Sequence, residues 1–206
     1  AYLYPLNFKE FLLALKQDGL IDYIDKFSFD KPTSQALHEK IIEYLRLYYF
    51  IGGMPEAVKV FAESNNLIEV EKVHMSILTS LQYDFAKYGT RKQQELLKEC
   101  LIYSAKNVGK KVKYVNINKN VHSSYLKETF LKLELSRIVH LVHKTESFKV
   151  PINQYEDKSV FKPVFLDIGL SCSISKIKLT DIKNLITDYE GTLAEQFVGQ
   201  ELISSF

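Results

Sequence analysis

The segment Arg137-Ile-Val-His-Leu-Val-His-Lys144 decides how the middle of this chain of 206 residues is interpreted. Its closely spaced β-branched residues are typical of a β-strand. A stretch with helical periodicity, 121–135, comes directly before it and places Leu126, Phe130 and Leu133 on one face. We therefore predict a helix followed by a strand.

Short segments on either side complete the pattern. Residues 112–115 are strand-like, and a second run of branched residues, 160–166, can return beside the first as a hairpin. Pro163 lies inside this returning run and has no amide donor, so we expect its strand to lie at an edge of the sheet or to begin at the proline. Helix, short helix, helix and hairpin is the order of a winged helix.

Residues 6–89, at the start of the chain, are predicted to be helical. Apolar side chains recur every three or four residues over 6–15 and again over 37–49, which gives each stretch one apolar face. Few β-branched runs interrupt this part. A bundle of helices is therefore expected here.

Two pairs of side chains mark helix starts within and after this bundle. Asn66 precedes Glu69 by three residues, and Thr90 precedes Gln93 by the same distance. At this spacing the two side chains can each accept a hydrogen bond from a free backbone amide of the first turn. We predict helices that begin at these pairs, the second ending before Asn107.

The remainder is expected to contain short helical turns over 168–188 and a final helix from Thr192 to the end. The predicted fold class is thus mainly α with a small β component. Three domains are expected: a helical bundle at 1–89, a winged helix at 90–150 and a third segment at 151–206.

Composition excludes several classes of protein. The chain is 46% hydrophobic and 25% charged, as in ordinary globular domains. No uncharged stretch approaches the roughly 20 apolar residues that cross a bilayer, and the start of the chain has no basic segment followed by an apolar one. Cys100 and Cys172 are too few for a disulfide framework or a zinc knuckle. We expect no membrane or secretory role and a reducing, cytoplasmic location.

Charge is distributed unevenly along the chain. The net charge is +2, but residues 91–149 hold 13 Lys and Arg against 5 Asp and Glu, a local excess of +8. The rest of the chain is correspondingly acidic. A segment that concentrates positive charge is a candidate nucleic-acid contact, a solvated surface or a docking face.

Five phrases, in this order, resemble one family of proteins: the bacterial and archaeal AAA+-like P-loop ATPases that carry a carboxy-terminal domain of unknown function related to PD-(D/E)XK nucleases. The phrases are Tyr2-Leu-Tyr-Pro-Leu-Asn-Phe-Lys-Glu-Phe11, Tyr49-Phe-Ile-Gly-Gly-Met-Pro-Glu-Ala57, Asp84-Phe-Ala-Lys-Tyr88, Phe165-Leu-Asp-Ile-Gly-Leu170 and Gly191-Thr-Leu-Ala-Glu-Gln-Phe-Val-Gly-Gln-Glu-Leu202.

The resemblance implies that this chain is the middle of a longer protein, and Ala1 in place of an initiator Met agrees with that expectation. An ATPase core would precede it and a nuclease-like core would follow. The bundle would then be lid-like, and 151–206 would be the start of a truncated PD-(D/E)XK-like domain. Neither G-x-x-x-x-G-K-[ST] nor an acidic strand motif is present. ATP and Mg are implied for the complete protein, and no cofactor for this chain.

Gly53 and Pro55 form the first candidate site. In related ATPases a Gly-x-Pro in the helical lid packs against the adenine, so the resemblance makes these two residues nucleotide contacts. From the residues alone, the alternative is a helix that stops at the glycines and a second helix with proline in its first turn.

Nucleic-acid binding by the winged helix is the second candidate. Outward residues of helix 123–134 would lie at the position that such folds use to read the major groove, and nearby basic residues would contact phosphates. The alternatives are a solvated basic face or a face that docks on the ATPase core. The candidate residues are Lys110, Lys111, Lys113, Ser123, Ser124, Lys127, Lys132 and Arg137.

Acidic residues of the last helix are the third candidate. A helical projection places Leu193, Ala194, Phe197 and Val198 on one apolar arc, with Glu201 inside it as a buried hydrogen-bond acceptor. Glu195 is expected to cap the helix together with Thr192. By resemblance Glu195 is also a weak candidate for a divalent-metal ligand; no other metal or catalytic residue is expected.

We therefore expect a non-catalytic coupling or regulatory module that links the nucleotide state of an ATPase core to a carboxy-terminal effector domain, both as partners from the same protein. The alternatives are a winged-helix module that binds duplex DNA and a fragment of a metal-dependent nuclease.

Overall fold

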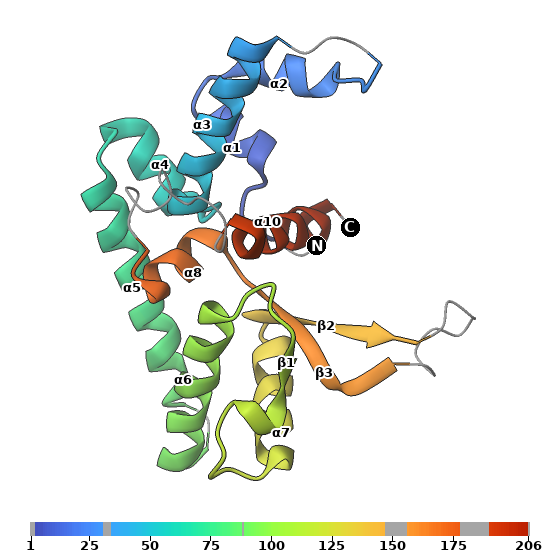
Figure 1. The fold of residues 1–206 in the computed structure, drawn as a ribbon. Helices are drawn as coiled ribbons and strands as arrows, with labels where there is room; N and C mark the ends of the chain where they lie inside the picture. The colour runs from blue at the N-terminus through green and yellow to red at the C-terminus, as the bar shows by residue number, and fades with distance from the viewer. Residues whose placement is uncertain (1–2, 31–33, 88, 147–155, 178–189, 206) are drawn as a thin grey trace.

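The structure is a computed structural model that describes residues 3–30, 34–87, 89–146, 156–177 and 190–205. In these residues the fold is mainly α-helical with one small sheet, as predicted (Figure 1). The helices are α1 (Phe8–Ala14), α2 (Asp18–Asp25), α3 (Gln35–Ile51), α4 (Pro55–Ser64), α5 (Leu67–Phe85), α6 (Arg91–Lys106), α7 (Ser123–Leu135), α8 (Ile168–Ser175) and α10 (Glu190–Ser205), with a 3-10 turn η1 at Tyr114–Asn116. The helical turns expected over 178–188 lie outside the described residues.

The two capping pairs predicted within and after the bundle have different outcomes. At α6, Thr90 and Gln93 form the expected reciprocal cap, in which the Thr90 amide donates to Gln93 Oε1 at 2.8 Å. At α5 the prediction of a reciprocal cap is wrong. Asn66 accepts from the Ile68 amide at 3.0 Å, but the Glu69 carboxylate forms an ion pair with Lys72, 2.7 Å away, instead of accepting from the Asn66 amide. A lysine within reach of the carboxylate offers an ion pair in place of the cap.

The sheet has three antiparallel strands, β1 (Val112–Lys113), β2 (Val139–Thr145) and β3 (Glu156–Phe165), in the order β1-β3-β2. Along the chain, β1 lies between α6 and η1, and β2 and β3 follow α7, which is the order of helix, short helix, helix and hairpin expected from the sequence. β3 is therefore part of this sheet although it lies beyond residue 150.

The expectation for Pro163 is wrong, because β3 is the central strand and continues on both sides of the proline. β1 is only two residues long and pairs with Phe161 and Val160, so it ends before it reaches Pro163. The Pro163 carbonyl instead accepts from the Gly109 amide at 3.3 Å. No carbonyl group of β1 lies opposite Pro163 to accept the hydrogen bond that proline cannot donate.

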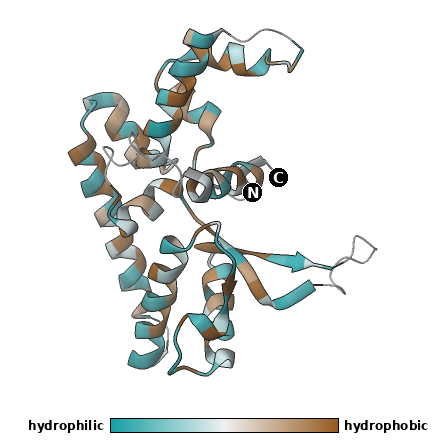
Figure 2. Ribbon diagram, viewed as in Figure 1, coloured by the Kyte–Doolittle hydropathy of each residue, from teal (hydrophilic) through white to brown (hydrophobic). Residues whose placement is uncertain are grey.

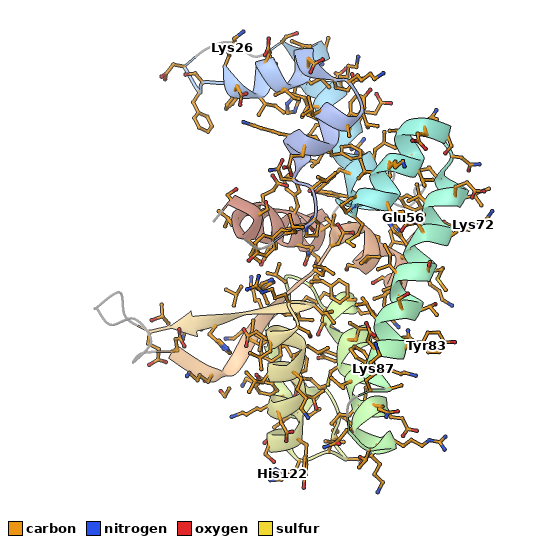
Figure 3. All side chains as sticks on the ribbon, turned by 180° about the vertical axis from the view of Figure 1, so that it is seen from behind. Lys26, Glu56, Lys72, Tyr83, Lys87 and His122 are labelled. Carbon is orange, nitrogen blue, oxygen red and sulfur yellow. The ribbon has the colours of Figure 1, made fainter. Side chains whose placement is uncertain are left out.

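Two hydrophobic clusters fill the interior, and Figure 2 shows hydrophobic and hydrophilic residues interspersed along the helices that supply them. In the first cluster, between the sheet and helices α6 and α7, the rings of Phe130 and Phe161 are 5.0 Å apart, centroid to centroid. In the second cluster the Tyr48 ring packs against Phe8 and Phe11 of α1 and against Phe197 of α10. Helices α5 and α8 contribute residues to both clusters. In Figure 3, Lys72 and Tyr83 project outward from α5, away from both clusters.

Candidate functional site

Asp167 is a fully buried carboxylate at the point where β3 ends and α8 begins. Its Oδ1 accepts from the Leu170 amide at 3.0 Å, and its Oδ2 accepts from the Gly53 amide at 2.6 Å. Burial raises the pKa of Asp167, and these backbone amides act in the opposite direction. The side chain therefore caps α8 and holds the turn between α3 and α4 at the same time.

Glycines 52 and 53 allow this close contact. Gly52 has φ +73°, and a Cβ there would lie 2.1 Å from Asp167 Oδ1. A Cβ on Gly53 would lie 2.0 Å from the carbonyl oxygen of Leu6, whose own amide donates to the Gly53 carbonyl at 2.7 Å. Any side chain at either position would separate these segments.

Helix α10 reaches the same carboxylate through Gln200. The Gln200 Oε1 accepts from the Ile168 amide at 2.9 Å, while Nε2 donates to Tyr48 Oη at 2.9 Å and lies 3.4 Å from Asp167 Oδ2. The Tyr48 hydroxyl donates to the Leu6 carbonyl at 2.6 Å. Burial and the charge of Asp167 raise the pKa of Tyr48, so it stays a neutral donor. We call Tyr48, Gly53, Asp167 and Gln200 the Asp167 network.

Three further side chains fix the helices around this network. Gln196 forms two 2.8 Å hydrogen bonds with the backbone of Phe165, accepting from its amide and donating to its carbonyl. His74 of α5 is buried, and its Nε2 donates to the Ile51 carbonyl at 2.9 Å. Glu201 accepts from the Phe8 amide at 2.9 Å, as expected, although it is only partly buried and not fully buried.

The chemistry open to this site is structural. Asp167 has no exposed surface, and both of its oxygens accept hydrogen bonds from fixed backbone amides. A general acid or base has to reach the proton that it transfers. The arrangement fastens five elements, α3, α4, β3, α8 and α10, at one point.

The predicted nucleotide contacts occupy different surroundings. Gly53 is buried, and its amide is already bonded to Asp167. Pro55 is exposed as the first residue of α4, directly after the turn that ends α3. This is the helix stop and proline start that the residues alone indicate. Pro55 alone retains a surface that a base could contact.

The predicted nucleic-acid residues are partly brought together. Lys132 pairs with Glu128 at 2.8 Å, and Lys127 lies 5.6 Å above the ring of Tyr114. The outward face of α7 also carries Leu131 and Leu135, which are 51% and 75% exposed. The helix as a whole has two lysines and two glutamates, so it is electrically neutral. The remaining candidates are exposed at Lys110, Lys111, Lys113 and Ser124, and partly exposed at Ser123 and Arg137.

Two expectations for α10 are wrong. Because the helix begins at Glu190, Thr192 lies inside it and cannot form the capping pair; Glu195 instead pairs with Lys162 at 2.5 Å. Leu193 is buried as predicted, but Val198 is 52% exposed. The inward face includes Gln196 and Gln200, which sequence reasoning missed. Their spacing of four residues beside Leu193 is the signal that could have placed them.

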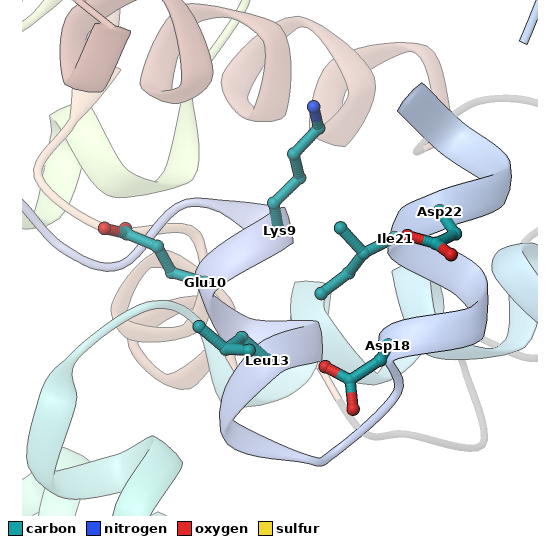
Figure 4. Close-up of a pocket in the computed structure, with 6 residues that line it drawn as sticks. All are labelled: Lys9, Glu10, Leu13, Asp18, Ile21 and Asp22. Carbon is teal, nitrogen blue, oxygen red and sulfur yellow. The ribbon is translucent and has the colours of Figure 1, made fainter. Parts of the chain in front are cut away.

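No metal site accompanies Glu195 in the part of the chain that the structure describes, where no three His, Cys, Asp or Glu side chains gather closely enough to hold an ion. A shallow hollow of about 250 Å³ lies between α1 and α2 (Figure 4). Lys9, at its edge, is ion-paired with Asp25.

Among the described residues, none of the helices combines the length and the apolar content needed to cross a lipid bilayer.

Fold and site together define a mainly α protein with one small antiparallel sheet, in which α3, α8 and α10 are joined by a buried polar network. The chain belongs to the family described as Domain of unknown function (DUF8612), whose model matches residues 42–181. Tyr48, Gly53 and Asp167 lie within the matched range, and Gln200 lies beyond it. No curated protein and no solved structure matches the chain.

Proposed function

We propose that this chain is a non-catalytic coupling module, which transmits the nucleotide state of a P-loop ATPase core to an effector domain within one longer protein. The ATPase core and the effector domain are included in the proposal because the sequence resembles that family of ATPases. The chain's own contribution is mechanical.

One observation supports this proposal. Four of the five phrases that carry the resemblance meet at the Asp167 network: Leu6 from the first, Gly53 from the second, Asp167 from the fourth and Gln200 from the fifth. Gly53 and Asp167 are 114 residues apart in sequence, and Gln200 and Tyr48 are 152 apart. Segments from the beginning, middle and end of the chain therefore share one rigid point.

Such a network suits transmission because buried hydrogen bonds leave little room for gradual adjustment. Each bond that breaks leaves a buried donor or acceptor unsatisfied, at a cost of about 1–3 kcal/mol. A displacement of the α3–α4 turn would thus move α8, β3 and α10 with it. Packed elements of this kind switch between discrete arrangements.

The experiment compares the purified chain with the complete gene product. We expect the chain alone to show no ATP turnover. In the gene product, ATP and Mg should change hydrogen exchange at the Phe165 and Ile168 amides, which Gln196 and Gln200 hold. Gln200→Leu should abolish that change, whereas Gln82→Leu, a partly exposed glutamine on α5, should leave it intact.

ATP turnover by the isolated chain would contradict the proposal. Hydrogen exchange at these amides that does not change when nucleotide is added would contradict it as well. Pro55→Ala in the gene product tests the lid contact separately. If Pro55 packs on the base, nucleotide affinity falls; unchanged affinity would remove this residue from the site without affecting the coupling proposal.

Duplex DNA binding is the second candidate, favoured by the strand order of the sheet and by the lysines around β1. The neutral α7 with its exposed leucines is a poor reading surface, so any binding should come from phosphate contacts and weaken steeply with salt. A duplex titration at low and high salt measures this. Absence of binding at low salt would eliminate the candidate.

A further inference from the structure

Two neighbouring hollows lie along the sheet, and the apolar one lies on the face that is turned away from α7. Phe161 of β3 packs on Phe130 of α7, so the alternate residues Lys162 and Val164 face the other side. Figure 1 shows α10 on that side of the sheet and α7 on the opposite one. Val142 and Lys162 line both hollows, which makes them one continuous feature that we call the wing groove.

One end of the wing groove is apolar and lies between the sheet and α10. It measures about 400 Å³, within the size range of ligand-binding pockets. Val142, Val198 and Leu202 converge there, and each is more than half exposed, at 52%, 52% and 55%. Single exposed apolar residues are ordinary, but three from two elements around one hollow indicate an interaction surface.

The other end, toward the wing, measures about 300 Å³ and is basic. Lys144 lies on β2, Lys162 lies on β3 and Lys111 directly precedes β1, so lysines from three segments line this end. The two hollows together are lined by these three lysines and by one carboxylate, Glu195, which pairs with Lys162, while Glu146, outside the lining, lies 3.8 Å from Lys144. An occupant with negative charge beside its apolar surface would match this lining.

The shape of the apolar end indicates a helix. Ala194, Val198 and Leu202 are four residues apart and form a ridge along α10 beside the hollow. Ridges of this spacing pack into the grooves of a second helix. Helix α10 already lies on this face, close enough for Val164 to meet Gly199, so a second helix beside it would extend an existing layer.

We propose that the wing groove binds an amphipathic α-helix whose apolar face carries acidic residues along one flank. The apolar face covers Val142, Val198 and Leu202, and the acidic flank meets Lys111 and Lys144. Nucleic acid fits less well, because the aliphatic ridge offers no donor to a phosphate. This surface is independent of the Asp167 network and goes beyond the coupling function.

The test uses a fluorescein-labelled synthetic peptide of about 18 residues, long enough to be helical, with leucines along one face and glutamates along one flank. Fluorescence anisotropy with the 206-residue chain should show saturable binding. Leu202→Asp should weaken it about tenfold or more, since it removes a buried leucine contact. Met75→Asp, at a residue 58% exposed on α5, is the matched control and should bind normally.

Charge recognition is tested separately. Lys111→Glu combined with Lys144→Glu should weaken binding and reduce its salt dependence, while Lys98→Glu on α6 should not. A peptide with lysines in place of the glutamates should bind more weakly than the acidic one. Circular dichroism of each variant establishes that it is folded.

Several results would overturn the proposal. They are an absence of saturable binding, equal effects of Leu202→Asp and Met75→Asp, and equal affinity for a peptide interrupted by prolines. Duplex DNA that displaces the peptide and binds more tightly would assign the groove to nucleic acid. Self-association in sedimentation that Leu202→Asp abolishes would assign it to a second copy of this chain.

Discussion

Gly53→Ala should destabilise the protein severely, even though it adds only one methyl group. The new Cβ would lie 2.0 Å from the Leu6 carbonyl oxygen and 2.9 Å from the Leu6 amide nitrogen. Both atoms belong to the backbone, so no side-chain rotation can relieve the contact. The Leu6 and Gly53 segments must separate by about 1.4 Å, from 2.0 Å to 3.4 Å, to restore an ordinary van der Waals distance.

The expected loss follows from the bonds at this position. Separation stretches the 2.7 Å bond from the Leu6 amide to Gly53, and it strains the 2.6 Å bond from Gly53 to Asp167. A neutral hydrogen bond contributes about 0.5–1.5 kcal/mol and one to a charged group about 1.5–3 kcal/mol. We therefore expect the free energy of unfolding to fall by about 2–4 kcal/mol, a large part of the stability of a typical domain.

Urea unfolding followed by circular dichroism measures this difference, with Gly19→Ala as the matched control. Gly19 lies in α2, and a Cβ there would meet no atom within 4 Å. Alanine should stabilise that helix by about 0.5–1 kcal/mol. A loss below about 1 kcal/mol for Gly53→Ala would refute the claim that close backbone approach requires glycine at this turn.

Three other predictions concern single side chains. Gln196→Leu removes two hydrogen bonds to the Phe165 backbone and should lower the free energy of unfolding by about 2–4 kcal/mol. Val198→Ser, at an exposed position on the same helix, is the control and should change this free energy by less than about 0.5 kcal/mol. Similar values for the two variants would contradict the assignment. Burial raises the pKa of Glu201 above its usual 4.5, so the native state holds this proton longer than the unfolded state, and stability should fall as pH rises from 4.5 through the raised pKa. Glu201→Gln should remove that part of the pH dependence in unfolding curves; parallel curves for both proteins would be inconsistent with it. Burial also raises the pKa of Cys100 to about 12 and that of Cys172 above its usual value, so a thiol reagent should label both only after unfolding, and rapid labelling of the native protein would disprove this.

The helices and the winged-helix order could be predicted because their signals are local. An apolar face repeats within one or two turns, as in Leu126, Phe130 and Leu133, all three of which are buried. Thr90 and Gln93 are three residues apart and cap α6 as expected. The pairing at Asn66 failed because a competing partner, Lys72, was equally close in sequence.

The candidate site could be predicted only in fragments. The phrases that contain Gly53, Asp167 and Gln200 were recognisable, but their contact with one another was not. Pro163 was misplaced for a related reason. A proline weakens a ladder only where a neighbouring strand would accept from the amide that it lacks, and the length of β1, on that side, is decided by tertiary packing.

The sequence by itself determined which segments are helix or strand, their order along the chain and the positive charge of 91–149. Only the tertiary structure decided that a carboxylate, a glycine turn and two glutamines share one buried site. Periodicity reports the face that a helix turns inward, because apolar surface is excluded from water wherever it lies. A buried polar group is satisfied by one partner in one geometry, and here that partner lies up to 152 residues away.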